Sequence, residues 1–143
     1  MTPEQIFSLA NYVAMAGWLI LILGSRTRWA ATLVSGAILP LLLAVLYAGL
    51  VAAHWGETNG GFGSLAAVAT LFSNSWLLLA GWVHFLAFDL FIGSWQVREA
   101  RAHNVPIWAV VPCLLLTFLF GPAGLLAYFA IRFVRARTVK VGA

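Results

Sequence analysis

Apolar residues fill four long runs of this chain, and most polar residues lie in the short stretches between the runs. The runs cover residues 6–24, 29–53, 76–95 and 107–134. Each is long enough to cross roughly 30 Å of hydrocarbon as a helix that rises about 1.5 Å per residue. None shows the alternation of a barrel strand, and backbone groups in lipid must be paired internally. The pattern predicts an all-α polytopic membrane protein, a bundle of four transmembrane helices.

The connections predict how the spans are joined. Residues 25–28 and 96–106 are short links, so the helices on either side of each should be antiparallel. The middle connection opens with the turn-rich stretch HWGETNGGFG and continues into residues 64–72, which are apolar but too few to cross. We expect these residues to form an interfacial or re-entrant helix with Ser64 as its cap.

Composition supports a membrane rather than an aqueous setting. Hydrophobic residues make up 63% of the chain and charged residues 8%, against about 25% charged residues in a soluble domain. Residues 1–143 therefore form a single integral membrane domain with the lipid bilayer as its partner, and a soluble enzyme is excluded. The N-terminus lacks the positive charge of a signal peptide, and no organelle transit peptide is evident. The simplest location is a bacterial inner membrane.

The net charge of +4 does not indicate nucleic acid, because the basic residues flank the apolar runs, where membrane proteins keep their cations. Four spans would put both termini on one side. The cations then divide four against four, and the denser C-terminal cluster favours termini inside. The two groups are Arg132, Arg135, Arg137 and Lys140 on the tail side, and Arg26, Arg28, Arg98 and Arg101 in the loops.

Prolines interrupt two of the runs. Pro40 lies in the second, and Pro112 and Pro122 lie in the fourth, the last of them directly after Gly121. Each removes a backbone donor and displaces the carbonyl four residues earlier. The pattern predicts kinked helices repaired by their neighbours, or a polar backbone notch that helps line a cavity.

Two ionisable residues lie inside the third run, Asp89 and His84. A carboxyl in hydrocarbon costs roughly 2.5–3.5 kcal/mol even on mild insertion scales, so it must face protein, water or a ligand. Asp89 can be a structural tie between helices or a general acid or base. His84 can be a hydrogen-bonded core residue or the second group of a catalytic pair.

A helical wheel separates these two residues. At 100° per residue, His84 shares one stripe with Phe88 and Phe91, whereas Asp89 lies about 140° away, on the stripe of Trp82 and Gln96. They cannot form a same-face pair, which needs a spacing of three or four. The third helix must therefore bury two faces, and we expect it to be central.

Aromatic residues crowd the same run. Several of the tryptophans elsewhere lie at the ends of runs, as interface anchors do. Those of the third run can line a slot for a long conjugated or isoprenoid ligand, or simply pack against neighbouring helices. These candidate substrate-binding residues are Trp82, Phe85, Phe88, Phe91 and Trp95.

Other chemical signatures are missing. The chain has no His-x-x-x-His or Cys-x-x-Cys spacing for a metal and no glycine-rich phosphate loop after a strand, so we expect neither a metal nor a cofactor. The single Cys113 rules out an intrachain disulfide. Small residues at Ala30-Ala31, and Gly121 with Gly124, are typical of close helix packing or of a homo-oligomer.

Residues 63–73, 81–91 and 112–125 together resemble the abscisic-acid-deficient-four-like family of small membrane proteins. The strongest part is the run W-x-H-x-L-A-x-D-L-F at residues 82–91. The plant members are needed to make neoxanthin, and they carry a transit peptide and a longer middle connection. This chain shows neither, so it resembles a bacterial member. The resemblance implies a four-helix membrane fold.

The chemistry that this resemblance implies is an isomerisation of the carotenoid violaxanthin. An epoxide opens while a neighbouring polyene carbon loses a proton, giving an allene, and no redox cofactor is needed. We expect His84 and Asp89 to supply the acid and the base. The alternative is a non-catalytic membrane protein: a lipid or pigment binder, a scaffold or a small transporter.

Overall fold

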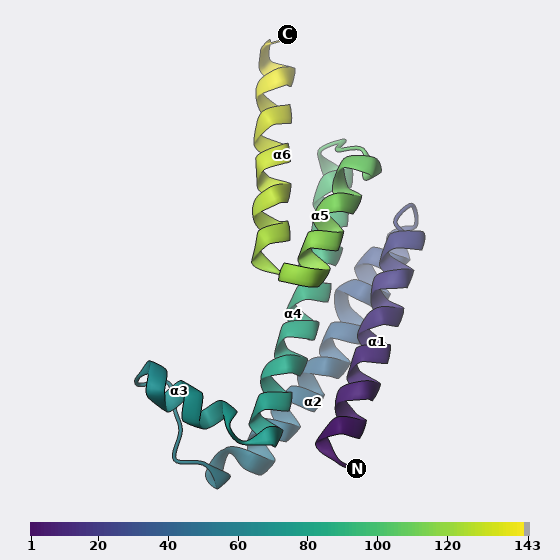
Figure 1. The fold of residues 1–143 in the computed structure, drawn as a ribbon. Coiled ribbons are helices and arrows are strands. Elements are labelled where there is room, and N and C mark those ends of the chain that lie inside the picture. Colours follow the sequence, from purple (N-terminus) through teal and green to yellow (C-terminus); the bar gives the residue numbers. More distant parts are fainter. Residues whose placement is uncertain (142–143) are drawn as a thin grey trace.

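The computed structural model describes the backbone of residues 1–141 and the side chains of residues 1–135. Within that part the chain is helical throughout and has no strand. The elements are α1 (Pro3–Leu23), η1 (Ala30–Ile38), α2 (Leu39–His54), η2 (Trp55–Glu57), α3 (Leu65–Phe72), α4 (Ser75–Ala102), α5 (Ile107–Phe120) and α6 (Pro122–Val141) (Figure 1).

Three helical stretches in the described part are long and apolar enough to cross a membrane: Pro3–Leu23, Ala30–Glu57 and Ser75–Ala102. They correspond to the first three predicted spans, and the chain is an integral membrane protein. The first begins at a capping box, in which Thr2 Oγ1 accepts from the Gln5 amide (3.3 Å) and the Thr2 amide donates to Gln5 Oε1 (2.9 Å).

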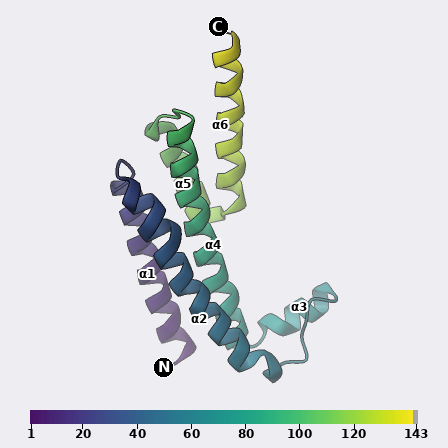
Figure 2. The ribbon, with the colours of Figure 1, turned by 180° about the vertical axis from the view of Figure 1, so that it is seen from behind.

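Helix α4 is the central element, as the two buried faces of the third run predicted. It packs against α1, α2 and η1 on one side and against α5 and α6 on the other (Figures 1 and 2). The contact with α1 is close, because a Cβ on Gly93 would lie 2.5 Å from the Trp18 ring. The small residues Ala30 and Ala31 are also buried within the chain.

Helix α4 is longer than the apolar run. The link expected over residues 96–106 is helical up to Ala102, so only four residues connect α4 to α5. The two extra turns are held by buried apolar residues, Val97 and Ala100, and by Arg101, whose Nη2 donates to the Thr27 carbonyl (2.8 Å). Hydropathy alone missed this extension because its outward residues are charged.

The second run continues through its proline. Residues Ala30–Ile38 form a π-helix, η1, which passes directly into α2 with Pro40 near its start. A π-helix pairs each carbonyl with the amide five residues later, and such segments often occur at functional positions.

The fourth run is two helices, so the prediction of one continuous span over residues 107–134 is wrong. Helix α5 ends at Phe120, the chain turns at Gly121, and α6 runs back beside α5 (Figures 1 and 2). Gly121 has a φ of 43°, which residues with a Cβ rarely adopt, and Pro122 cannot donate to the preceding turn. The combination ends α5 and starts α6.

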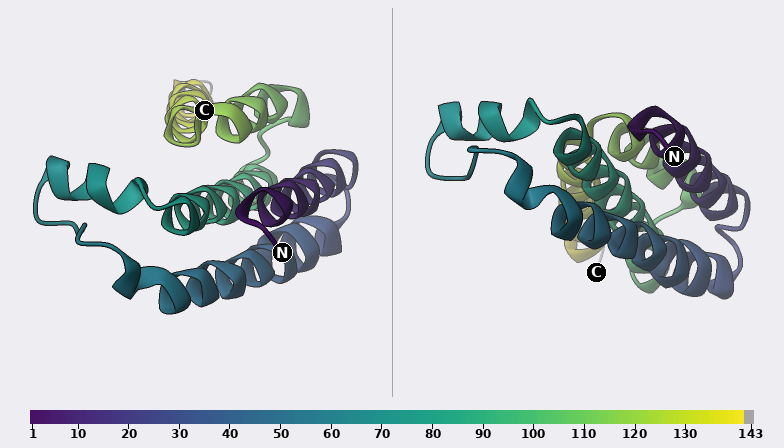
Figure 3. Two further views of the ribbon diagram at one scale, coloured as in Figure 1. Left: turned by 60° about the horizontal axis from the view of Figure 1, so that its bottom comes forward. Right: turned by 90° about the horizontal axis from the view of Figure 1, so that it is seen from below.

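The predicted short helix is present as α3. Ser64 caps it, accepting from the Ala67 amide at 3.1 Å, as expected. The helix extends sideways from the end of α4 that lies near the N-terminus (Figure 3). Leu71 is buried there against the Gly60 backbone.

Candidate functional site

Asp89 lies in the middle of α4, where the turn between α5 and α6 closes over it. Its side chain is 8% exposed. A Cβ on Gly121 would lie 2.6 Å from Asp89 Oδ1 and 3.3 Å from Oδ2, so only glycine leaves room for the carboxyl. Oδ2 is buried with no hydrogen-bond partner among the described residues. Most buried polar atoms in proteins are hydrogen-bonded, so an unpaired one calls for an explanation, such as a catalytic role or contact with a bound molecule.

A set of polar side chains continues from Asp89 between α4, α5 and α6. Thr117 Oγ1 lies 3.1 Å from Gln96 Oε1 and 2.8 Å from the Cys113 carbonyl, so its one proton serves two acceptors. Gln96 Nε2 and the Tyr128 hydroxyl are buried and lack partners among the described residues. The helical wheel had put Gln96 on the stripe of Asp89, but Thr117 and Tyr128 can be found only once the turn at Gly121 is known.

An ionic group closes this interface at the end of α4. Glu99 Oε1 accepts from Arg132 Nη2 at 3.3 Å, and His103 Nδ1 lies 3.1 Å from the same oxygen. All three side chains are partly exposed, so the contact contributes little to stability. The contact shows that α6 returns to the C-terminal end of α4.

His84 lies on a different face of α4, as the wheel predicted. Its ring centroid is 4.6 Å from that of Phe88 and 5.6 Å from that of Tyr47 on α2. The side chain borders a cavity of about 240 Å³ between α2, α3 and α4. His84 is exposed in the single chain, whereas Asp89 is buried, so the structure does not bring the two predicted catalytic residues together.

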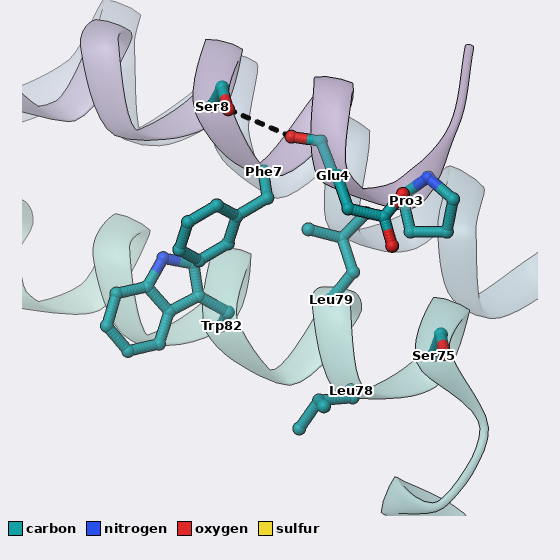
Figure 4. Close-up of a pocket in the computed structure, with 8 residues that line it drawn as sticks. All are labelled: Pro3, Glu4, Phe7, Ser8, Ser75, Leu78, Leu79 and Trp82. Atoms are coloured by element: carbon teal, nitrogen blue, oxygen red, sulfur yellow. Dashed lines mark hydrogen bonds between the residues drawn. The ribbon is translucent and has the colours of Figure 1, made fainter.

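Trp82 and Phe85 lie on the Asp89 side of α4. Their ring centroids are 5.7 Å apart, and Trp82 Nε1 donates to Asn11 Oδ1 on α1 (3.1 Å). Phe7 lies against the indole at 5.6 Å. Phe7 and Trp82 line an apolar groove of about 420 Å³ between the starts of α1 and α4, shown in Figure 4.

The other three predicted ligand-binding aromatics lie elsewhere. Phe88 and Phe91 border a second apolar groove of about 420 Å³ beside Pro40 of α2. Trp95 packs against α6, with its centroid 5.7 Å from that of Tyr128. The five aromatics therefore do not line one continuous slot in the single chain, and only Trp82 and Phe85 share a stripe with Asp89.

Arg98 is part of the helical core, not of a loop as the sequence had suggested. Its Nη1 donates to the Ala31 carbonyl in η1 (2.9 Å) and to Ser94 Oγ (3.0 Å). The guanidinium carbon also lies 5.9 Å from the centre of the Phe91 ring. Arg98 ties α4 to the π-helix and is a structural group.

The described part of the chain has no group of three His, Cys, Asp or Glu residues that could hold a metal ion. The candidate site consists of a buried carboxyl, a helix turn and partly exposed aromatic rings. The fold and this site define a small α-helical membrane protein with an intramembrane carboxyl.

The chain belongs to the ABA DEFICIENT 4-like family, whose sequence model matches residues 5–128. This match covers most of the chain and includes Asp89, His84 and the Gly121 turn. It confirms the resemblance inferred from the sequence and makes the chain a membrane protein related to the neoxanthin-synthesis proteins. No curated protein and no solved structure matches the chain.

Proposed function

We propose that the protein binds a carotenoid or a related isoprenoid from the lipid phase and isomerises it by proton transfer through Asp89, without a cofactor. The observation that supports this most directly is the unpaired Asp89 carboxyl, buried at mid-helix under the Gly121 turn. Family membership supports the substrate class.

We expect the ligand to lie along the face of α4 that carries Asp89, on the N-terminal side of the Gly121 turn. Trp82, Phe85 and Asp89 are spaced by three and four residues, so they lie above one another on one face. The distance along the axis from Trp82 to Asp89 is about 10 Å at 1.5 Å per residue. Trp82 is 40% exposed, and Phe120 beside the turn is 63% exposed. A rigid polyene can lie along this face with one end group under the turn.

One carboxyl is sufficient for the chemistry that the family suggests. The acid form of Asp89 gives its proton to the epoxide oxygen as the C–O bond breaks. The resulting carboxylate removes a proton from the neighbouring polyene carbon, the allene forms, and Asp89 is again an acid. Atoms and charge balance, and nothing is oxidised or reduced. This route replaces the two-residue scheme, because His84 lies on another face of α4.

The test is expression in a host that accumulates epoxide-bearing carotenoids, followed by chromatography and mass analysis of the pigments. The wild-type protein should form an isomer of unchanged mass, and Asp89→Asn should form none. Glu57→Gln is the matched control, because it removes an exposed carboxyl far from the turn. His84→Ala in the same assay should keep substantial activity.

Three results would contradict the proposal. If the wild-type protein leaves the pigments unchanged in several carotenoid backgrounds, it is not an isomerase of this class. If Asp89→Asn is active and His84→Ala is inactive, the reaction takes place on the His84 face of α4. A pigment that co-purifies with wild-type protein without any product would favour the alternative of a non-catalytic pigment binder.

A further inference from the structure

The hairpin of α5 and α6 reaches only to the middle of α4. Its tip, Gly121, packs on Asp89, which is the fifteenth of the 28 residues of α4. From Gly121, both helices of the hairpin extend toward the C-terminal end of α4. Thr117 of α5 meets Gln96, and Arg132 of α6 meets Glu99. Both arms therefore lie along the second half of α4.

The uncharged part of α6, which ends before Arg132, fits a return to the surface rather than a crossing. Arg132, the first cation of α6, lies ten positions after Pro122, which is about 15 Å of helix, or half of the hydrocarbon thickness. Non-helical backbone at such a depth is tolerated where protein buries it. Gly121 is buried, and Pro122 has no amide hydrogen to leave unpaired.

This arrangement gathers the cations at one end of the molecule. Arg101 donates to the Thr27 carbonyl, which places the α1–η1 turn, with Arg26 and Arg28, beside the end of α4. The other end holds Glu4 and Glu57 and, apart from the amino terminus, no permanent cation. All eight Lys and Arg residues of the sequence fall on the first end: Arg26, Arg28, Arg98, Arg101, Arg132, Arg135, Arg137 and Lys140.

We propose that the chain crosses the membrane three times, that α5–α6 is a re-entrant hairpin, and that the basic end binds the anionic headgroups of the cytoplasmic leaflet. A four-span chain would place four Lys and Arg residues on each side of the membrane. With three spans all eight lie on one side, and the positive-inside rule assigns that side to the cytoplasm. The N-terminus and α3 then lie outside, opposite to the C-terminal helix. The proposal is independent of any activity at Asp89.

Cysteine labelling tests the topology. Starting from Cys113→Ala, single cysteines are placed by Thr2→Cys, Asn59→Cys, Asn104→Cys or Thr138→Cys, and intact cells are treated with a membrane-impermeant maleimide. Positions 2 and 59 should react in intact cells, whereas 104 and 138 should react only after permeabilisation. Cells carrying Cys113→Ala alone give the background.

Each alternative outcome overturns a defined part of the proposal. Labelling of positions 2 and 138 from the same side would mean that α5–α6 crosses the membrane, so the hairpin would not be re-entrant. Labelling of 104 and 138 in intact cells, with 2 and 59 protected, would invert the orientation.

The lipid partner is tested by mass analysis of phospholipids that co-purify with the protein. The triple variant Arg26→Gln, Arg28→Gln, Arg135→Gln removes three exposed cations. It should retain several-fold less anionic phospholipid relative to zwitterionic phospholipid than the wild type does. Glu57→Gln, at the other end, should leave the ratio unchanged. An equal ratio in the triple variant would overturn the headgroup contact.

Discussion

Prolines lie near the start of α2 (Pro40), inside α5 (Pro112) and at the start of α6 (Pro122), and the outcomes at Pro40 and Pro122 are opposite. Before Pro40 the backbone widens into the π-helix η1 and continues into α2. Before Pro122 the backbone reverses. The residue that differs is Gly121, whose positive φ allows a sharp turn that no residue near Pro40 adopts. Proline weakens a helix in both places, but the preceding glycine decides whether the chain turns back.

Each interruption also faces a charged or ionisable residue of α4, and these two residues are used differently. Arg98 bonds to the Ala31 carbonyl of η1 and to Ser94, so it serves the scaffold. Asp89 faces Gly121 with one oxygen unpaired. Arg98 therefore ties α4 to the π-helix that precedes Pro40, whereas the carboxyl that faces the Gly121–Pro122 turn has an oxygen with no partner among the described residues.

The largest expected effect comes from filling the turn. Gly121→Val places a branched side chain at a positive φ, which costs about 1–2 kcal/mol, and against the Asp89 carboxyl, where overpacking costs about 1–3 kcal/mol. We expect the free energy of unfolding in detergent, measured by denaturant titration, to fall by about 3 kcal/mol.

The matched control for this variant is Gly49→Ala in α2, where an added Cβ meets no atom within 4 Å. Alanine is the better helix former, so stability should hold or rise by up to about 1 kcal/mol. Similar losses in both variants would show that neither the φ nor the Asp89 contact at Gly121 is special.

The next effect concerns the contact of Arg98 with the π-helix η1. Arg98→Ala leaves the Ala31 carbonyl and the Ser94 hydroxyl without their charged partner, and hydrogen bonds to charged groups contribute about 1.5–3 kcal/mol. We expect a loss of about 2 kcal/mol in the same titration. Arg26→Ala, an exposed arginine, should stay within about 0.5 kcal/mol of wild type. Equal effects would place Arg98 among the surface cations, as the sequence alone had done.

Much of this architecture could be predicted from the sequence. The apolar runs gave the first three membrane helices, the wheel gave a central α4 with His84 and Asp89 on different faces, and the turn-rich middle connection gave α3. These features depend on periodicity and local capping, which a single sequence shows directly.

The remaining features depend on contacts between distant segments. Hydropathy cannot distinguish one long apolar helix from two that reverse at Gly121, because both have the same composition. That ambiguity hid the closure over Asp89, the partnership of Thr117 with Gln96 and the return of α6 to Glu99. For a related reason the sequence left open whether the five aromatic residues line one slot or pack separately, since a wheel shows faces but not which neighbours cover them.

A smaller loss of stability is expected when a hydrogen-bonded polar group near the turn, the Thr117 hydroxyl, is removed. Thr117→Val keeps the shape of the side chain and removes the hydroxyl that lies 3.1 Å from Gln96 Oε1. A neutral hydrogen bond contributes about 1 kcal/mol, so stability should fall by that amount. Thr32→Val, at an exposed position in η1, is the control and should change little. A neutral result for Thr117→Val would mean that the Gln96 contact does not hold α5 to α4.

The smallest expected change in stability is that of Asp89→Asn. The substitution keeps the shape beside Gly121 and removes no hydrogen bond that the described structure shows for the carboxyl. Stability should therefore stay within about 0.5 kcal/mol of wild type, while isomer formation is lost because the amide cannot exchange a proton with the ligand. A fall of about 2 kcal/mol or more would mark a structural tie like Arg98, as expected for a carboxyl that loses charge-assisted bonds. The contrast between Arg98 and Asp89 would then disappear, because both would be structural ties between helices.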